Sequence, residues 1–372
     1  MDKQKKAYAR AGVDVDLGNK LKRRIGQLVG QTHGPEVLGK TGGFGGLFRV
    51  QFSGMRDPVL AASIDGVGTK LKIAFAMNRH GTVGADLVNH CVNDIAVLGA
   101  RPLFFLDYIG CEKLEERVFN QLLRGFSRAC RSAGCALIGG ETAQMPGMYG
   151  KGEYDLAGCI VGVVDHSKII DGSKIRPGDV VLGLMSSGLH TNGYSLARKI
   201  LFEKMRLKVG SRLPGSTTEP PGGERRRRES PRGLTSRAAS QSSTVGAELL
   251  RVHKNYQPLL AKVPRGMIKG LAHITGGGLI DNLPRILPKN CDAMIETKSW
   301  RVPRIFQILQ RNGDVDLAEI FKSPFAIKRS RPVLLARDAE QQPSRPRGRR
   351  RAHCNIPNIG SNNIRAERYR QN

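Results

Sequence analysis

The sequence has few aromatic side chains and lacks both paired cysteines and long apolar runs. Aromatic residues make up 5% of its 372 residues, and it contains 45 glycines, a composition that favours a loop-rich α/β protein over a helical bundle. The seven cysteines include no Cys-x-x-Cys pair, which argues against a zinc ribbon and favours reduced thiols in an intracellular protein. No apolar run approaches the ~20 residues of a membrane-spanning helix, and the first residues lack the apolar stretch of a secretory signal. We therefore expect a cytoplasmic protein.

Negative charge is also scarce, and the positive excess is unevenly spread. The chain has 60 Lys and Arg against 32 Asp and Glu, a formal net charge of +28. Residues 211–246 hold seven Arg against three Glu, and residues 322–372 hold thirteen Lys and Arg against three acids. These segments therefore carry half of the excess charge. Their basic runs, 225–228 and 345–351, leave a nucleic-acid-binding interpretation open, although no recognition motif or interleaved aromatic residue accompanies them.

Two segments have a composition that cannot supply a packed core. Residues 214–243 form a low-complexity stretch with almost no apolar content. Residues from about 322 to 372 are rich in Arg and Pro and show little sustained periodicity. Both compositions are typical of disordered chain, so we expect an unstructured insert and an unstructured basic tail.

The remaining residues predict a layered α/β (α+β) protein with two domains. Residues 82–99 carry an apolar stripe at spacings of four and three, and their opposite face is polar, which predicts an amphipathic helix. We expect the first domain at 1–170 and the second at 171–321. The first would contain, in order, a strand, helix, strand, helix and two strands at 59–64, 82–99, 103–109, 114–133, 135–138 and 156–164. The second would contain strands at 180–185 and before the Gly-rich loop at 275–278, a further strand at 292–297 and a helix at 303–312.

An acid follows directly after the first of these strands. Asp65 ends the run "VLAASI", and Gly66, Gly68, Thr69 and Lys70 come next. Glycine lets backbone N–H groups approach an anion, and a lysine neutralises phosphate, so one interpretation is a metal and phosphate site. The other is a tight turn in which Asp65 bonds only to the backbone. These residues alone leave the two interpretations equal.

Two further acids favour the metal interpretation. Glu141 follows an apolar strand and two glycines in "ALIGGE", the same construction as at Asp65. Asp94 lies beside the polar face of the 82–99 helix. Carboxylates together with nucleotide phosphates are the ligands that Mg²⁺ takes in proteins. We therefore predict that Asp65, Asp94 and Glu141 hold Mg²⁺.

Glycine-rich loops supply weaker candidates for phosphate contacts. The loop "TGGFGG" contains Gly42, Gly43, Gly45 and Gly46 but matches no standard nucleotide motif. In the second domain, "SSGLHTNG" and "ITGGG" precede predicted helices, whose free N–H groups bind phosphates. For His190 we keep two roles open, a catalytic or substrate-binding side chain and a neutral hydrogen-bonding group. The candidates in these two loops are Ser187, His190, Asn192, Gly276, Gly277 and Gly278.

A series of motifs, in this order, resembles the phosphoribosylformylglycinamidine cyclo-ligase family, also called aminoimidazole ribonucleotide synthetases. The resemblance covers about residues 7–213 and 244–321. The motifs are "YARAGVDVDLGN", "GGFGGLF", "SIDGVGTKLKIA", "NHCVNDIAVLGARPLFFLDY", "GGETAQMPGMY", "YDLAGCIVGVV", "SSGLHTNGYSLAR" and "HITGGGLIDNLPRILP".

The resemblance implies a fold, a reaction and residue roles. The fold is that of selenophosphate synthetase and thiamine-monophosphate kinase, with first-domain sheets that join into a barrel across a homodimer. The reaction converts formylglycinamidine ribonucleotide and ATP into aminoimidazole ribonucleotide, ADP and phosphate. Asp65, Asp94 and Glu141 would carry Mg²⁺, whereas Lys70 and the glycines at 42–46 would hold ATP phosphates. The second-domain candidates, His190 among them, would face the substrate.

The chain also departs from the family. About 28 extra residues precede "VGAELLRVHKNY", and the strand, helix and strand that the family has after residue 321 are absent. We interpret both segments as out-of-frame translation, and we expect the loss of an internal strand to leave a sheet edge uncovered. Two alternatives to the active enzyme therefore stay open: an inactive remnant of it, and a basic nucleic-acid-binding protein.

Overall fold

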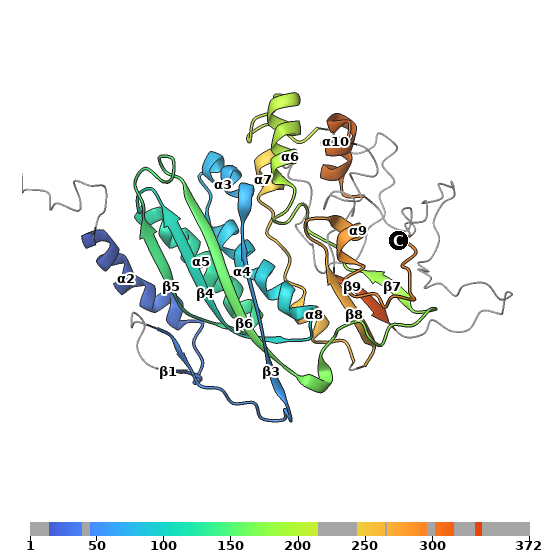
Figure 1. Ribbon diagram of the computed structural model, residues 1–372. Coiled ribbons are helices and arrows are strands. Elements are labelled where there is room, and N and C mark those ends of the chain that lie inside the picture. The colour runs from blue at the N-terminus through green and yellow to red at the C-terminus, as the bar shows by residue number, and fades with distance from the viewer. Residues whose placement is uncertain are drawn as a thin grey trace, which may run out of the picture.

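The structure, a computed structural model, describes residues 15–38, 45–214, 244–264, 266–295, 302–315 and 332–336. In these residues the chain forms two α/β units that lie side by side (Figure 1). Gly42, Gly43, residues 215–243 and the two basic runs lie outside the described residues, so the predictions about them remain predictions. No helix of the described part is long and apolar enough to cross a membrane.

The first unit is built on a four-stranded sheet with the order β3-β6-β4-β5. Strands β4 and β5 are parallel, whereas β6 pairs antiparallel with both β3 and β4. The structure confirms all four predicted strands and extends the third of them to residue 144. The strands are β3 (Pro58–Gly66), β4 (Arg101–Cys111), β5 (Ala136–Gln144) and β6 (Tyr154–Asp165).

Two long helices, α4 (Gly81–Ala96) and α5 (Glu116–Ala133), cover one face of this sheet (Figure 1). Both were predicted, and most of their apolar stripes are buried, although Leu98 lies beyond the end of α4 and is 41% exposed. The helices pack with little space between their backbones, because a Cβ at Gly84 would lie 2.5 Å from the carbonyl oxygen of Leu122. Helix α5 ends at Gly134, whose φ of 67° is the left-handed conformation that glycine adopts readily at a helix C-terminus.

The opposite face of the sheet is left bare by the described helices. Side chains of β3 alternate between the faces, so that Ala61 and Ser63 point toward α4. Leu60 and Ile64 point the other way and are 62% and 72% exposed. An apolar sheet face of this kind is typical of a surface that a partner covers.

The first unit also contains several helices, strands and turns that were not predicted. Helix α2 (Val15–Gly30) packs beside α5, where the Ser127 hydroxyl donates to the Leu28 carbonyl over 2.8 Å. Strands β1 (Val37–Leu38) and β2 (Leu47–Phe48) form an antiparallel pair on either side of the "TGGFGG" segment in the sequence. After the sheet's first strand come a 3₁₀ turn (Gly68–Lys70) and helix α3 (Leu71–Met77), and a second 3₁₀ turn (His166–Lys168) follows β6.

The second unit contains a three-stranded antiparallel sheet with the order β7-β9-β8. Its strands are β7 (Val180–Gly183), β8 (Ile268–His273) and β9 (Pro332–Ala336). Because β9 lies in the basic tail, the expectation of an unstructured tail is wrong for residues 332–336. The run "PVLLA" is apolar and pairs with β7 on one side and with β8 on the other. The expectation of an uncovered sheet edge remains a prediction.

Short helices surround this sheet. They are α6 (Tyr194–Arg198), which continues as a π-helical turn (Lys199–Lys204), α7 (Val245–Leu249), α8 (Gln257–Leu260), α9 (Gly278–Asn282) and α10 (Arg304–Gly313). The predicted helix at 303–312 is thus confirmed. The predicted strand at 292–297 is wrong over 292–295, where Ala293 and Ile295 pack against the second-domain core from an irregular segment.

One apolar core runs through both units. It includes Leu87 and Leu122 from the first unit and Tyr194, Leu249 and Ile305 from the second. A smaller cluster lies under β7, β8 and α9 in the second unit. Because the main core is shared, the residues at the boundary of the two units hold fixed positions relative to each other.

Candidate active site at the junction of the two units

Asp65 lies at the end of β3 and faces α4. Its Oδ2 is 3.0 Å from Nε2 of His90, and its Oδ1 accepts a 2.6 Å hydrogen bond from the N–H of Gly66. Burial raises the pKa of Asp65, but the hydrogen bond and charge of His90 and the Gly66 N–H outweigh it, so the pKa is lowered overall. Both interpretations of this turn are therefore compatible: the carboxylate bonds to backbone and remains ionised beside the second unit.

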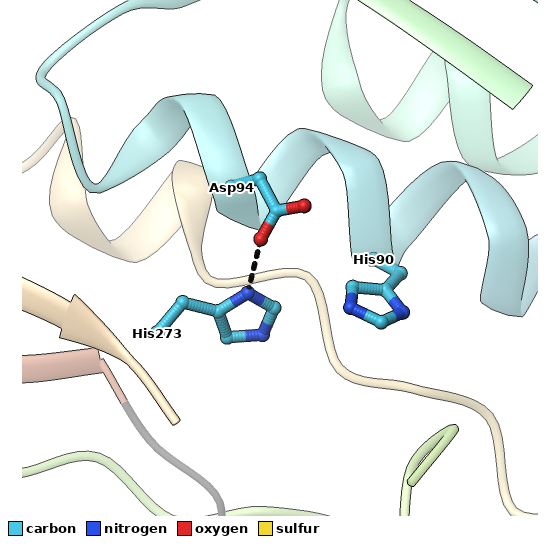
Figure 2. A group of neighbouring side chains, drawn as sticks. All are labelled: His90, Asp94 and His273. Atoms are coloured by element: carbon cyan, nitrogen blue, oxygen red, sulfur yellow. Dashed lines mark hydrogen bonds and ion pairs between the residues drawn. The ribbon is translucent and has the colours of Figure 1, made fainter. Parts of the chain in front are cut away.

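Asp94 lies close to Asp65 and is held in the same way. It accepts hydrogen bonds from the hydroxyl of Ser63 over 2.9 Å and from His273 Nδ1 over 2.7 Å (Figure 2). Burial raises its pKa, but the bond to His273 and the neighbouring imidazoles lower it overall. The charge of Asp94 in turn raises the pKa of Asp65. Two ionised carboxylates that repel each other in this way would be stabilised by a cation between them.

Glu141 does not join this acid pair within one chain. Asp65 lies on one edge strand of the sheet and Glu141 on the other. The register aligns Asp65 with Gly158, Asp107 and Gly140, so three strand spacings, about 14 Å, separate the two edges. Glu141 is one residue further along β5, and strand alternation turns its exposed side chain to the bare face. The predicted three-carboxylate site is therefore not assembled by a single chain.

The ammonium of Lys70 forms its contacts with other groups of the protein. Its side chain is 0% exposed and lies 2.7 Å from Oδ2 of Asp86, which is equally buried. The ammonium also donates to the carbonyls of His190 and Arg251 over 2.8 and 2.7 Å. Burial lowers the pKa of Lys70, and the charge of Asp86 opposes that shift. Because an ammonium has three donors, this arrangement leaves none for the ATP phosphate that Lys70 was predicted to bind.

The polar stripe of α4 is buried against an extended segment of the second unit, Arg251–Tyr256. Asp86 accepts from the N–H of His253 over 2.6 Å, and Asn89 donates to the His253 carbonyl over 2.7 Å. Asn93 accepts from the N–H of Tyr256 over 2.9 Å. Among the described residues this segment has no sheet partner, so these side chains supply hydrogen bonds to its buried backbone. A stripe that resembles a solvated helix face is in fact the contact between the units.

Four of the eight histidines form one buried cluster at this contact. They are His90, His190, His253 and His273, with ring centroids 4.1–5.6 Å apart. Burial lowers the pKa of His190 and His253 well below the ordinary value, and it lowers that of His273. For His90 burial also lowers the pKa, but the hydrogen bond and charge of Asp65, with the charges of Asp94 and Asp86, outweigh it, so the pKa is raised overall. The cluster thus has two rings paired with carboxylates, His90 with Asp65 and His273 with Asp94, and two rings, His190 and His253, whose pKa is lowered well below the ordinary value.

The ring of His190 shapes its own loop. Its backbone adopts a left-handed φ of 62°, and its Nε2 accepts from the N–H groups of Ser187 and Lys254 over 3.1 and 3.4 Å. An Nε2 that accepts carries no proton, so the ring is neutral with its hydrogen on Nδ1. This geometry fits the neutral hydrogen-bonding role better than that of an acid acting through Nε2.

The remaining predicted residues lie in loops around the cluster. The Ser187 hydroxyl donates to the Val252 carbonyl over 2.6 Å, and Thr69 lies 3.1 Å from the Ser195 hydroxyl. Asn192 is half-buried in the loop that follows His190. The loop after β8 contains Gly277 and Gly278 with φ of 85° and 62°, and the Asn282 amide donates to the carbonyls of Gly276 and Gly278.

The two described glycines of the "TGGFGG" loop, Gly45 and Gly46, lie elsewhere. A Cβ at Gly46 would be 2.8 Å from Ile138 of β5, so this end of the loop lies against the same strand as Glu141. Gly45 is exposed beside it, and Gly68 lies in open space at φ 66° in the turn after Asp65. The predicted site residues thus divide between the two edges of the first sheet.

Sequence reasoning did not identify His90, His253, His273 or Asp86 as part of the site. For His273 a signal was present, because it ends strand β8 immediately before a Gly-rich loop, as Asp65 does after β3. Polar residues of α4 were noted, but nothing in the sequence pairs them with residues 160 positions away.

The comparisons with known proteins agree with this architecture. Models of the N-terminal and C-terminal domains of AIR synthase related proteins match residues 50–164 and 176–326. The chain is 49% identical over 323 residues to the phosphoribosylformylglycinamidine cyclo-ligase of Syntrophotalea carbinolica, covering 87% of this chain and 85% of that protein. It is 48% identical over 324 residues to the cyclo-ligase of Geotalea uraniireducens, covering 87% and 86%.

Solved structures share the fold at low sequence identity. Thiamine-monophosphate kinase from Stenotrophomonas maltophilia has a TM-score of 0.56 at 15% identity, covering 83% of this chain and 84% of that one. E. coli HypE, a hydrogenase maturation protein, has a TM-score of 0.54 at 15% identity, covering 86% and 82%. The two units therefore define a protein of the AIR synthase related class. At the identity given above, the chain belongs to the phosphoribosylformylglycinamidine cyclo-ligase family.

Proposed function

We propose that the protein catalyses the ATP-dependent closure of formylglycinamidine ribonucleotide to aminoimidazole ribonucleotide, with release of ADP and phosphate. The observation that carries this proposal is the identity of about half over 87% of the chain to two proteins named for this activity. The reaction belongs to purine biosynthesis, and a cytoplasmic location is part of the proposal.

The chemistry requires activation of a poor leaving group. An amide oxygen leaves slowly, so the γ-phosphoryl group of ATP is transferred to the formyl oxygen, with release of ADP, to give an iminophosphate. The amidine nitrogen then attacks that carbon, loses a proton, and the C–O bond breaks to release phosphate. In such transfers the protein mainly holds the reactants together and neutralises charge.

The acid pair fits a role in binding magnesium. Mg²⁺ is commonly held by one or two carboxylates together with substrate phosphates. Asp65 and Asp94 are both ionised, and their side chains keep 41% and 25% exposure. We assign these two residues to the ion. When bound, Mg²⁺ would neutralise the phosphate charge that develops during transfer. His90 and His273 hold the carboxylates in place.

The loops at this junction are assigned to the two substrates. Gly66, Gly68 and Thr69 lie beside the acid pair and would approach the ATP phosphates, together with the glycines at 42–46. Ser187, His190, Asn192 and the loop Gly276–Gly278 would face the ribonucleotide. In this proposal Lys70 is a positioning residue, because it holds the His190 loop through the carbonyl of His190.

We further propose a homodimer that forms through the bare face of the first sheet. Exposed Leu60 and Ile64 on that face support it. Glu141 points to the same face, so in the dimer it would have to reach the acid pair of the opposite protomer around the end of β3, where the Asp65 side chain is 41% exposed. This assignment keeps Glu141 as a contributor to the magnesium site without requiring it to cross its own sheet.

A coupled assay of ADP release tests the proposed function. The full chain with ATP, Mg²⁺ and formylglycinamidine ribonucleotide is expected to release ADP in step with formation of aminoimidazole ribonucleotide. Asp65→Asn is expected to lower kcat by at least about 100-fold with the fold intact, since it removes charge at the transferring phosphoryl group. Unchanged turnover in that variant would contradict the assignment of Asp65.

A second candidate is a protein of the same fold without turnover. The observation that motivates it is that the match to the C-terminal family model ends at residue 326. Binding of ATP measured by calorimetry, without ADP release in the assay above, would support this candidate over the active enzyme.

A further inference from the structure

Helix α5 carries a stripe of arginines on its outer side. Arg117, Arg124, Arg128 and Arg131 follow one another at spacings of seven, four and three residues, and all four are exposed. At about 100° per residue, these positions lie within about 60° of the helix circumference and extend over about 21 Å of its length. Because α5 covers the face of the sheet opposite to the bare face, the proposed dimer would leave this arginine stripe accessible (Figure 1).

The arginine stripe is not neutralised by acids. None of its four side chains forms an ion pair with another described residue. The acids of α5 lie at its N-terminal end, where Glu116 is paired with Lys20 over 3.3 Å. Helix α2, which packs beside α5, adds four basic residues against one acid in its sequence. Protein surfaces usually mix the two signs of charge, so a face of one sign favours an anionic partner.

Three of the four guanidinium groups are oriented by single hydrogen bonds. Each donates to an uncharged group on a neighbouring segment: Arg117 to the Asn78 carbonyl (3.2 Å), Arg128 to the Gly81 carbonyl (3.4 Å) and Arg131 to the Gln31 side chain (3.4 Å). A guanidinium has five N–H donors, so one such bond leaves most of them for a ligand. Since the groups are already positioned, less side-chain entropy is lost when an anion binds.

We propose that the arginine stripe binds the phosphate backbone of a double-stranded nucleic acid. Guanidinium groups form paired hydrogen bonds with phosphate oxygens, and arginine is the preferred side chain for such contacts. Along the 21 Å of the stripe, a duplex presents about twelve phosphate charges. Contacts of this kind position a duplex without reading its sequence, so binding is expected to be independent of sequence.

The side chains of the stripe distinguish a duplex from other anionic partners. The stripe has no aromatic ring on which an unpaired base could stack, which favours a duplex over a single strand. A helix that lies on a lipid surface inserts apolar side chains, whereas the apolar side chains of α5 are turned into the core. A duplex needs only the charges and donors that the stripe presents.

Anisotropy titrations of a fluorescent mixed-sequence DNA duplex with the full chain, over a range of salt concentrations, test the stripe. The triple variant Arg124→Gln/Arg128→Gln/Arg131→Gln loses three phosphate contacts, so the slope of log affinity against log salt should decrease in magnitude by about 2.7. Between about 50 and 200 mM salt, its affinity should therefore fall roughly 40-fold less than that of the wild type. Circular dichroism checks that the variant is folded.

The matched control removes the same charge from the second unit. Lys174, Lys208 and Lys262 are exposed there, and changing all three to Gln should leave the salt slope of the wild type unchanged. Equal losses of slope in the two triple variants would mean that net charge alone drives binding, which overturns the proposal. A stripe variant that binds like the wild type would also overturn it and would assign binding to the basic runs at 225–228 and 345–351.

A second measurement needs no variant. A dicarbonyl reagent modifies accessible arginines of the wild-type chain, and mass spectrometry locates the modified residues. The duplex is expected to protect Arg124, Arg128 and Arg131. Protection by anionic phospholipid vesicles or by polyglutamate, but not by the duplex, would overturn the proposal in favour of that partner. Neither measurement involves turnover of ATP, so the result is independent of the proposed function.

Discussion

The two edges of the first sheet carry the same sequence construction in different surroundings. At the β3 edge, Asp65 lies in the last two residues of its strand and meets α4, where it pairs with His90. At the β5 edge, Glu141 lies within its strand after two glycines and is exposed. A strand, a glycine and an acid therefore do not define a site. The element that packs over the acid decides whether it becomes a fixed, ionised group or a surface carboxylate.

The difference between the edges is greatest in their polar interactions. The β3 edge adjoins a buried ion pair, four histidines and the hydrogen bonds from α4 to Arg251–Tyr256. These groups are buried in one chain alone. In our proposal, a second protomer contacts the β5 edge and the bare face. Variants at the two edges should therefore differ first in stability and then in how they respond to dimer formation.

The largest effect is expected for Asp86→Ala. This change leaves the ammonium of Lys70 buried without its counter-ion, and breaking a buried pair in this way costs about 3–5 kcal/mol. Urea unfolding followed by circular dichroism measures the loss. The control at the other edge is Glu141→Ala, which should change the unfolding free energy by less than about 0.5 kcal/mol. Similar losses in both variants would remove the distinction between the edges.

The second prediction concerns Glu141 and the dimer. Asp65→Asn and Glu141→Gln chains should each be inactive alone. If Glu141 acts on the opposite protomer, a 1:1 mixture refolded together contains heterodimers in which one of the two sites has both wild-type residues. Random pairing of a twofold dimer then restores about a quarter of the wild-type activity. ADP release from the mixture measures this recovery. A mixture as inactive as its components would place both residues in one protomer's site or refute the dimer.

Much of the fold was predictable because its signals are local. The stripe of α4 and the runs of β3, β4 and β6 have the periodicity of their secondary structure, and all appear where predicted. Strand β9 was missed because arginines and prolines around "PVLLA" gave the segment a disordered composition. Its pairing comes from β7 and β8, which lie more than 55 residues away in sequence.

The site was predictable only in part because its partners are distant in sequence. Asp65 and Asp94 were identified and do lie together. The sequence indicated a phosphate role for Lys70, but Asp86 and the carbonyl of Arg251, 181 residues away, occupy its ammonium. Glu141 looked equivalent to Asp65 because strand order is not visible in a single sequence. Tertiary contacts decided both outcomes.

The third prediction concerns Asp107, which lies between the two edges of the first sheet, in register with Asp65 on β3 and Gly140 on β5. Burial raises the pKa of Asp107 to about 7. The folded state therefore binds the proton more tightly than the unfolded state, and stability falls as pH rises from about 4 to 7. Asp107→Asn cannot ionise, so its thermal midpoint should exceed that of the wild type by several degrees at pH 8, with a smaller difference at pH 5.

The matched control for this pH dependence is Asp165→Asn. The Ser167 hydroxyl and the Arg56 N–H lower the pKa of Asp165 to about 2. Its contribution is fully present above the ordinary pKa of 3.8 and is lost only as pH falls toward 2. Asp165→Asn should therefore destabilise the protein equally at pH 5 and pH 8. If the difference in thermal midpoint between Asp107→Asn and the wild type were the same at pH 5 and pH 8, the raised pKa of Asp107 would be contradicted.

The smallest effect is expected two residues from the buried lysine. Lys72 forms a 2.6 Å ion pair with Glu153, but their side chains are 44% and 34% exposed. Exposed pairs contribute about 0–1 kcal/mol and are screened by salt. Lys72→Ala should therefore lower the unfolding free energy by less than about 1 kcal/mol, and the difference should vanish in about 1 M salt. Because Lys70 and Lys72 have the same charge and similar ion-pair distances, an equal cost for Lys72→Ala and Asp86→Ala would mean that burial is not what distinguishes the junction.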